Sequence, residues 1–323
     1  MKKPAHPNVL ALGLGSLLAV SLASLAGCKS CAPPPAGKTT VVVSIYPIYD
    51  LVRGVAGPDA DVALLLQPGK NEHTFDPTPK DVEEVSRAQI GVMVGLGLDP
   101  WMEKLLKDAA PKARVLKVGD RVPTRTVDAE AVGEDEAHAA HGGGKDDDDH
   151  DHEKGAIDPH VWLDPQNARL IVRAFAEEIA KVDASHANGY RERADALDKE
   201  LEALDKELVG RAKALPKKGF VTFHGSFGYF AKHYGLDIVA VIEPFPGSTP
   251  SGAYVQKVLG VLKEKKVPAL YSEPQLDARP AKVLADEAKI PLGVLDPVGG
   301  GAQTDGYAKM LRYDMAELEK YQK

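Results

Sequence analysis

Short runs of Val, Ile and Leu alternate with amphipathic stretches from Thr39 to the C-terminus. The apolar runs predict β-strands, and the stretches between them predict helices, near 48–56, 79–88 and 100–109 in the first half. The pattern resumes after Pro216 and ends in a helix that begins near Asp305. The predicted strands are 40–45, 62–67, 90–95, 114–118, 219–223, 237–242, 268–272 and 291–295. Apolar strands separated by helices form parallel βαβ units, so we predict an α/β fold of two similar lobes with mainly parallel sheets.

One long amphipathic helix is predicted between the lobes, from His186 to Leu215. Leucine or alanine recurs every three or four positions along it, with Glu and Lys elsewhere. The apolar positions are Leu197, Leu201, Leu204, Leu208, Ala212 and Leu215. About 28 helical residues would span about 42 Å before Pro216 ends the helix. A coiled coil is the alternative, but about two heptads are short for one. We therefore expect a rigid helix that joins the lobes, with a cleft between them.

The N-terminal residues have the pattern of an export signal. Two lysines precede an apolar run over 9–25, which ends in Leu-Ala-Gly-Cys at Cys28. This ending resembles the bacterial lipobox, in which the cysteine is lipidated and becomes the mature N-terminus; an uncleaved membrane anchor is the alternative. We expect a periplasmic or cell-surface lipoprotein, anchored to a membrane through Cys28. The expected divisions are a signal peptide (1–27), a spacer (28–38), an N-terminal lobe (39–185), the linking helix (186–215) and a C-terminal lobe (216–323).

The charge of the chain is concentrated in one segment. Lys and Arg total 40 and Asp and Glu total 47, for a net charge of −7. Residues 134–154 alone hold nine acids and two lysines, together with four of the ten histidines. An acidic chain does not suggest a nucleic-acid partner. The two cysteines, Cys28 and Cys31, both lie near the N-terminus, so a metal site in the folded part must use nitrogen and oxygen ligands.

Four polar residues stand at the ends of predicted elements. His73 follows a predicted strand, His160 precedes the helix start predicted at Asp164-Pro165, His224 closes the strand 219–223, and Asp296 ends the last strand. Ligand sites in open α/β sheets lie beyond the carboxyl ends of strands. Three imidazoles and one carboxylate would suit tetrahedral zinc. Spacing alone does not establish such a site, because these residues are scattered over more than 220 positions.

From Thr39 onward the chain resembles the metal-specific substrate-binding proteins of bacterial ABC transporters, which capture zinc or manganese outside the inner membrane. The resemblance rests on five motifs that occur in the family's order. They are Glu72-His73 followed by Pro79-Lys80-Asp81-Val82, then Asp158-Pro159-His160-Val161-Trp162-Leu163-Asp164-Pro165, His224-Gly225-Ser226-Phe227-Gly228-Tyr229-Phe230, Ser272-Glu273-Pro274-Gln275 and Leu295-Asp296-Pro297. The resemblance implies two lobes joined by one long helix, with metal bound at the lobe interface.

The ligands that the resemblance implies are His73, His160 and His224. Asp296 matches the usual position of the fourth ligand, and Glu72 is a rival for that role. Asp158 is expected to accept a hydrogen bond from His160 and orient its ring, a common need of metal-bound imidazole. Manganese-type members typically have Glu where His224 stands, and a third imidazole favours zinc over the oxygen-preferring manganese.

The acidic, histidine-rich loop at 134–154 is also typical of zinc-type members. Its histidines are His138, His141, His150 and His152. On a flexible tether they would bind extra zinc weakly and pass it inward. The alternative is a solvated, disordered run of charge.

We therefore predict a monomeric protein without catalytic activity that captures Zn²⁺ and delivers it to a membrane permease powered by an ATPase. A manganese-binding member of the same family is the first alternative. An exported zinc hydrolase is disfavoured because the chain has no His-Glu-x-x-His helix and no Gly-x-Ser-x-Gly elbow. Three histidines and an aspartate disfavour an organic iron chelate or a vitamin as cargo. Because imidazole must be neutral to bind metal, affinity is expected to weaken as pH falls through roughly 6.5.

Overall fold

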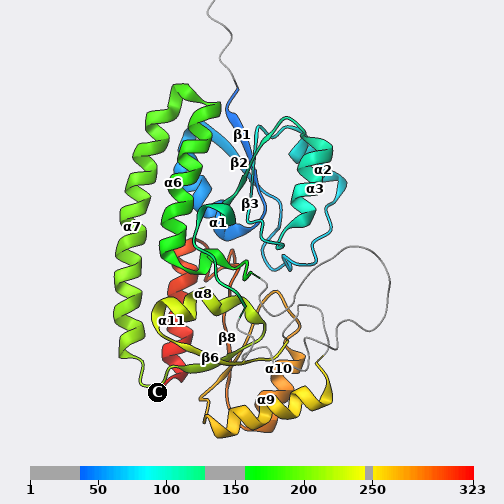
Figure 1. Cartoon of the computed structure of the whole chain (residues 1–323), viewed down its shortest axis with the longest axis vertical. Helices are drawn as coiled ribbons and strands as arrows, with labels where there is room; N and C mark the ends of the chain where they lie inside the picture. The colour runs from blue at the N-terminus through cyan, green and yellow to red at the C-terminus, as the bar shows by residue number, and fades with distance from the viewer. Residues whose placement is uncertain (1–36, 128–156, 244–249) are drawn as a thin grey trace, which may run out of the picture. The chain divides into compact units, whose positions relative to one another are not determined.

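Two four-stranded parallel sheets form the framework of the protein (Figure 1). The computed structural model describes residues 37–127, 157–243 and 250–323. The first sheet, in the order β2-β1-β3-β4, comprises β1 (Thr39–Val43), β2 (Ala60–Leu64), β3 (Ile90–Met93) and β4 (Arg114–Lys117). The second, in the order β6-β5-β7-β8, comprises β5 (Gly219–Thr222), β6 (Asp237–Val241), β7 (Leu270–Ser272) and β8 (Leu292–Val294). The predicted fold class, two α/β lobes with parallel sheets, is confirmed.

Helices follow most of the strands, and proline opens several of them. The first half holds α1 (Tyr46–Ala56), α2 (Pro79–Ser86), α3 (Pro100–Ala109) and α6 (Pro165–Val182). The remainder holds α7 (Ala187–Ala214), α8 (Gly228–Tyr234), α9 (Gly252–Glu264), α10 (Arg279–Ala288) and α11 (Tyr307–Tyr321). Helix α6 begins as predicted, because Asp164 caps it by accepting a hydrogen bond from the backbone N of Gln166, and Pro165 occupies the first turn. The expected signal peptide, lipidation site and His-rich loop lie outside the described residues.

Helix α7 is the predicted joining helix. It has 28 residues and lies alongside α6 (Figure 1). Arg193 of α7 donates to the carbonyl of Val55 in α1, and Arg211 pairs with Glu319 in α11 at 2.8 Å. The helix therefore contacts both halves of the chain, and its apolar face is buried against protein rather than exposed for a coiled-coil partner.

One of the apolar core clusters among the described residues contains residues of both halves. It includes Val41 of β1, Trp162, Phe220 of β5 and Tyr271 of β7, all at most 1% exposed. Trp162 Nε1 also donates to the carbonyl of Pro297, and the Tyr307 hydroxyl donates to the carbonyl of Trp162. This packing holds the loops that follow the two sheets in a defined arrangement. Among the described residues, no helix is both long enough and apolar enough to cross a bilayer.

Candidate metal centre

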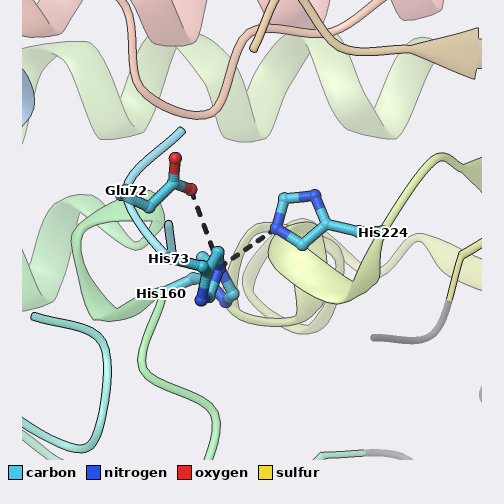
Figure 2. Close-up of side chains that lie close together, drawn as sticks. All are labelled: Glu72, His73, His160 and His224. Carbon is cyan, nitrogen blue, oxygen red and sulfur yellow. Dashed lines mark hydrogen bonds and ion pairs between the residues drawn. The ribbon is translucent and has the colours of Figure 1, made fainter. Parts of the chain in front are cut away.

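Four side chains from three separate segments converge on one point (Figure 2). Glu72 and His73 lie in the loop after β2, His160 directly precedes the short 3-10 turn Val161–Leu163, and His224 lies just past the end of β5. One ligand atom from each residue lies within 4.8 Å of the others. Glu72, His160 and His224 are 2–4% exposed, and the side chain of His73 is 19% exposed. The group is therefore largely screened from solvent.

One distance within this group matches the edge of a tetrahedral metal site, and a second is slightly longer. The Nε2 atoms of His160 and His224 lie 3.3 Å apart. With Zn–N bonds of about 2.0–2.1 Å, two nitrogens of a tetrahedral zinc are separated by about 3.3–3.4 Å. His73 Nε2 and Glu72 Oε1 are 3.9 Å apart, a little more than such an edge. Three nitrogens and one oxygen could thus surround one ion after small side-chain shifts.

The ring of His160 is oriented by Asp158. Asp158 Oδ1 lies 2.9 Å from His160 Nδ1 and also accepts from the backbone N of His160 at 3.0 Å. Because Nδ1 faces an acceptor, it carries the proton, and the lone pair of Nε2 is left for a metal. The expected contact between Asp158 and His160 is therefore present.

The ring of His224 also faces a buried carboxylate, that of Glu273, with which it forms an ion pair. Glu273 Oε2 lies 2.7 Å from His224 Nδ1, and Oε1 accepts from the backbone N of His224 at 3.2 Å. Burial opposes protonation of His224, but the charge and hydrogen bond of Glu273 outweigh it and raise the pKa of His224 to about 9. Burial raises the pKa of Glu72 as well. Because both pKa values are raised, His224 and Glu72 tend to hold protons in the absence of metal, and an incoming cation must displace them.

Sequence reasoning placed Glu273 in a motif but assigned it no role. The available signal was its position directly after β7, the strand that pairs with β5 and so ends beside His224. Trp162 also contacts the candidate metal centre. Its buried ring packs edge-on against His160, with the ring centroids 5.3 Å apart.

Asp296 lies outside the converging group and is engaged elsewhere. Its Oδ1 accepts from the side chain of Gln275 and from the backbone N of Gly299, and its Oδ2 accepts from the hydroxyl of Thr304. These bonds hold the turn that follows β8. Of the two candidates for the fourth ligand, the structure brings Glu72 to the three histidines. His138, His141, His150 and His152 fall outside the described residues.

Comparison with known proteins supplies the family. Residues 41–321 match the family described as "Zinc-uptake complex component A periplasmic". The chain belongs to this family. The resemblance stated from the sequence motifs is thereby confirmed. The family is one of transport components, which agrees with the prediction of a protein that is not an enzyme.

The chain is 28% identical over 271 residues to the zinc-binding protein AdcA of Streptococcus pyogenes serotype M3, an alignment that covers 82% of this chain and 51% of AdcA. It thus spans about half the length of this relative. It is also 28% identical over 295 residues to the high-affinity zinc uptake system protein ZnuA of Brucella abortus, covering 84% of this chain and 88% of that protein.

Solved structures agree with the fold. A crystal structure of ZnuA superposes with a TM-score of 0.76 at 24% identity, over 89% of this chain and all of that one. A Zn(II)-bound mutant variant of AdcAII from Streptococcus pneumoniae has a TM-score of 0.74 at 27% identity, over 90% of this chain and all of that one.

Proposed function

We propose that this protein captures zinc outside the inner membrane and delivers it to the permease of an ABC transporter. The observation that carries the proposal is the convergence of His73, His160, His224 and Glu72 within 4.8 Å. Three nitrogen donors and one oxygen donor favour zinc over manganese, which prefers oxygen. The zinc-binding and zinc-uptake names of the relatives support the same metal.

In this proposal the four side chains supply all the ligands of one zinc ion. A tetrahedral site closed by four protein ligands leaves no position for a reactive water, whereas catalytic zinc sites keep one open. The site is therefore suited to binding and release. Zinc is the cargo of the protein, and the same argument disfavours an exported zinc hydrolase.

The sequence supports finer parts of the proposal. A signal peptide over 1–27 and lipidation at Cys28 would tether the protein to a membrane, with 28–38 as a spacer. The lobes 39–185 and 216–323 and the helix 186–215 would act as one monomeric carrier, and the ATPase of the transporter would power transfer. The loop at 134–154 would collect further zinc through His138, His141, His150 and His152.

A competitive titration of zinc against manganese tests this function. The protein is prepared without residues 1–31, stripped with a chelator, and compared with its His160→Ala variant and with a deletion of 134–154. We expect one tight zinc site that manganese does not displace at equal concentration. It should be lost in His160→Ala and kept in the deletion. Tight binding that survives His160→Ala would overturn the assignment.

A further inference from the structure

The carboxylate of Asp158 has a second partner besides His160. Asp158 Oδ2 accepts from Arg125 Nη1 at 2.7 Å, while Oδ1 faces the imidazole. The Asp158 side chain is 1% exposed and that of Arg125 is 10% exposed. A buried carboxylate is costly unless it is paired and hydrogen-bonded. The guanidinium of Arg125 supplies the charge that balances Asp158.

Tyr229 holds the same two residues together. Its hydroxyl donates to the backbone carbonyl of Asp158 at 2.9 Å and accepts from the backbone N of Arg125 at 3.0 Å. The Arg125 guanidinium also lies 5.8 Å from the centre of the Tyr229 ring, within the range of a cation–π contact. Arg125 and Asp158 are thus linked through both side chain and backbone.

Gly228, the first residue of α8, makes room for this pair. A Cβ at this position would lie 1.7 Å from Arg125 Nη1 and 2.6 Å from Asp158 Oδ2. The backbone of Gly228 is ordinary right-handed helix, with φ of −58°, so its conformation does not require glycine. Glycine is required instead because the guanidinium of Arg125 occupies the space that a Cβ would fill.

We propose that Arg125 is a positioning residue for the metal site, acting through Asp158 on His160. Its hydrogen bond to Oδ2 holds the Asp158 carboxylate in place, so that Oδ1 accepts from His160 Nδ1 and Nε2 keeps its lone pair on the metal side. Gly228 completes the arrangement by leaving the guanidinium in contact with Asp158. This inference rests on the proposed function, since His160 is taken as a ligand.

The test is to measure zinc dissociation constants for the purified protein and four variants. Arg125→Met removes the charge, Arg125→Lys restores it, Gly228→Ala displaces the guanidinium, and Arg121→Met is the control, since it removes a charge from an exposed site in the same segment. Loss of a residue that hydrogen-bonds to a metal ligand typically weakens metal binding about 10- to 100-fold. We expect that loss in Arg125→Met and Gly228→Ala, near-normal affinity in Arg125→Lys and no change in Arg121→Met.

A second readout separates positioning from stability. Nuclear magnetic resonance of the zinc-loaded protein should show the His160 Nδ1–H proton in the wild type and in Arg125→Lys, and should show it shifted or lost in Arg125→Met. If Arg125→Met folds poorly, Gly228→Ala decides, because alanine favours helix over glycine. Wild-type affinity in Arg125→Met, or in a folded Gly228→Ala, would overturn the inference. Absence of tight zinc binding in the wild type would instead refute the proposed function.

Discussion

The Nε2 atoms of His160 and His224 lie 3.3 Å apart although the two residues are 64 positions apart in the chain. Behind each ring stands a buried carboxylate, Asp158 for His160 and Glu273 for His224. The Nε2 atoms of both imidazoles thus already face each other without metal, so zinc binding needs little rearrangement at these two ligands.

The fourth ligand is the first point to test. Glu72→Gln replaces the carboxylate that would bind the metal with a neutral amide, so we expect zinc affinity to fall at least about tenfold, equivalent to about 1.4 kcal/mol. Asp296→Asn is the matched comparison: it should keep zinc affinity and lower the melting temperature, because Asp296 accepts three hydrogen bonds in the turn after β8. A large loss of affinity in Asp296→Asn but not in Glu72→Gln would reverse the assignment.

Glu273 should matter although it is not a ligand. Glu273→Gln leaves a neutral partner behind His224, and zinc affinity is expected to fall about 10- to 100-fold. The pKa of His224 should move down from about 9, because the carboxylate that raises it is gone. Glu264→Gln, an exposed change in α9, is the control. Equal zinc affinity in both variants, measured by competition with a chelator, would show that Glu273 does not act on the site.

The pH dependence differs from the one expected from the sequence. A pKa of about 9 for His224 means that the metal-free site binds a proton below that pH, and zinc must displace it. Apparent zinc affinity should therefore fall about tenfold per pH unit from about pH 9 downward, rather than only below roughly 6.5. Calorimetry in buffers of different ionisation enthalpy should detect proton release at pH 7. Constant affinity from pH 9 to 7 would contradict this.

His233 is expected to stabilise the fold rather than bind metal. Its Nε2 lies 2.6 Å from Asp205 in α7, and its Nδ1 lies 3.3 Å from Asp164 at the start of α6. Burial opposes its protonation, but the two carboxylates outweigh it and raise the pKa of His233 to about 9. Because the folded-state pKa is raised, the stabilisation is fully present below about pH 6.5 and is lost as pH rises through 9.

Urea unfolding at pH 6 and pH 10 measures this contribution. His233→Gln should lower the free energy of unfolding by up to about 3 kcal/mol at pH 6 and by much less at pH 10. His186→Gln, which removes a half-exposed histidine paired with Asp183, should cost about 1 kcal/mol or less. A His233→Gln penalty that is the same at both pH values would rule out the charged pairs as its origin.

Local sequence signals predicted much of the fold. The apolar runs placed the strands to within a few residues, and the Asp164-Pro165 pair located the start of α6. The leucine spacing located α7, whose observed span of Ala187–Ala214 lies one residue inside each predicted end. These features depend on residues close together in the chain. The packing of α7 along α6 was not anticipated, because periodicity shows an apolar face but not what covers it.

The site was predictable only in part, because local patterns do not specify which distant segments come into contact. The motifs pointed to His73, His160 and His224, which the structure brings together. The choice between Glu72 and Asp296 depends on how two distant loops fold, and no local pattern encodes it. Arg125 was missed because its contact with Asp158 crosses 33 positions.

The measurement that tests the central claim most directly is crystallography of the zinc-loaded protein with data collected on both sides of the zinc absorption edge. We predict one strong anomalous peak about 2.0–2.2 Å from the Nε2 atoms of His73, His160 and His224 and from a carboxylate oxygen of Glu72. A peak held by Asp296 in place of Glu72 would correct the fourth ligand. A fully loaded protein with no peak at these histidines would contradict the account.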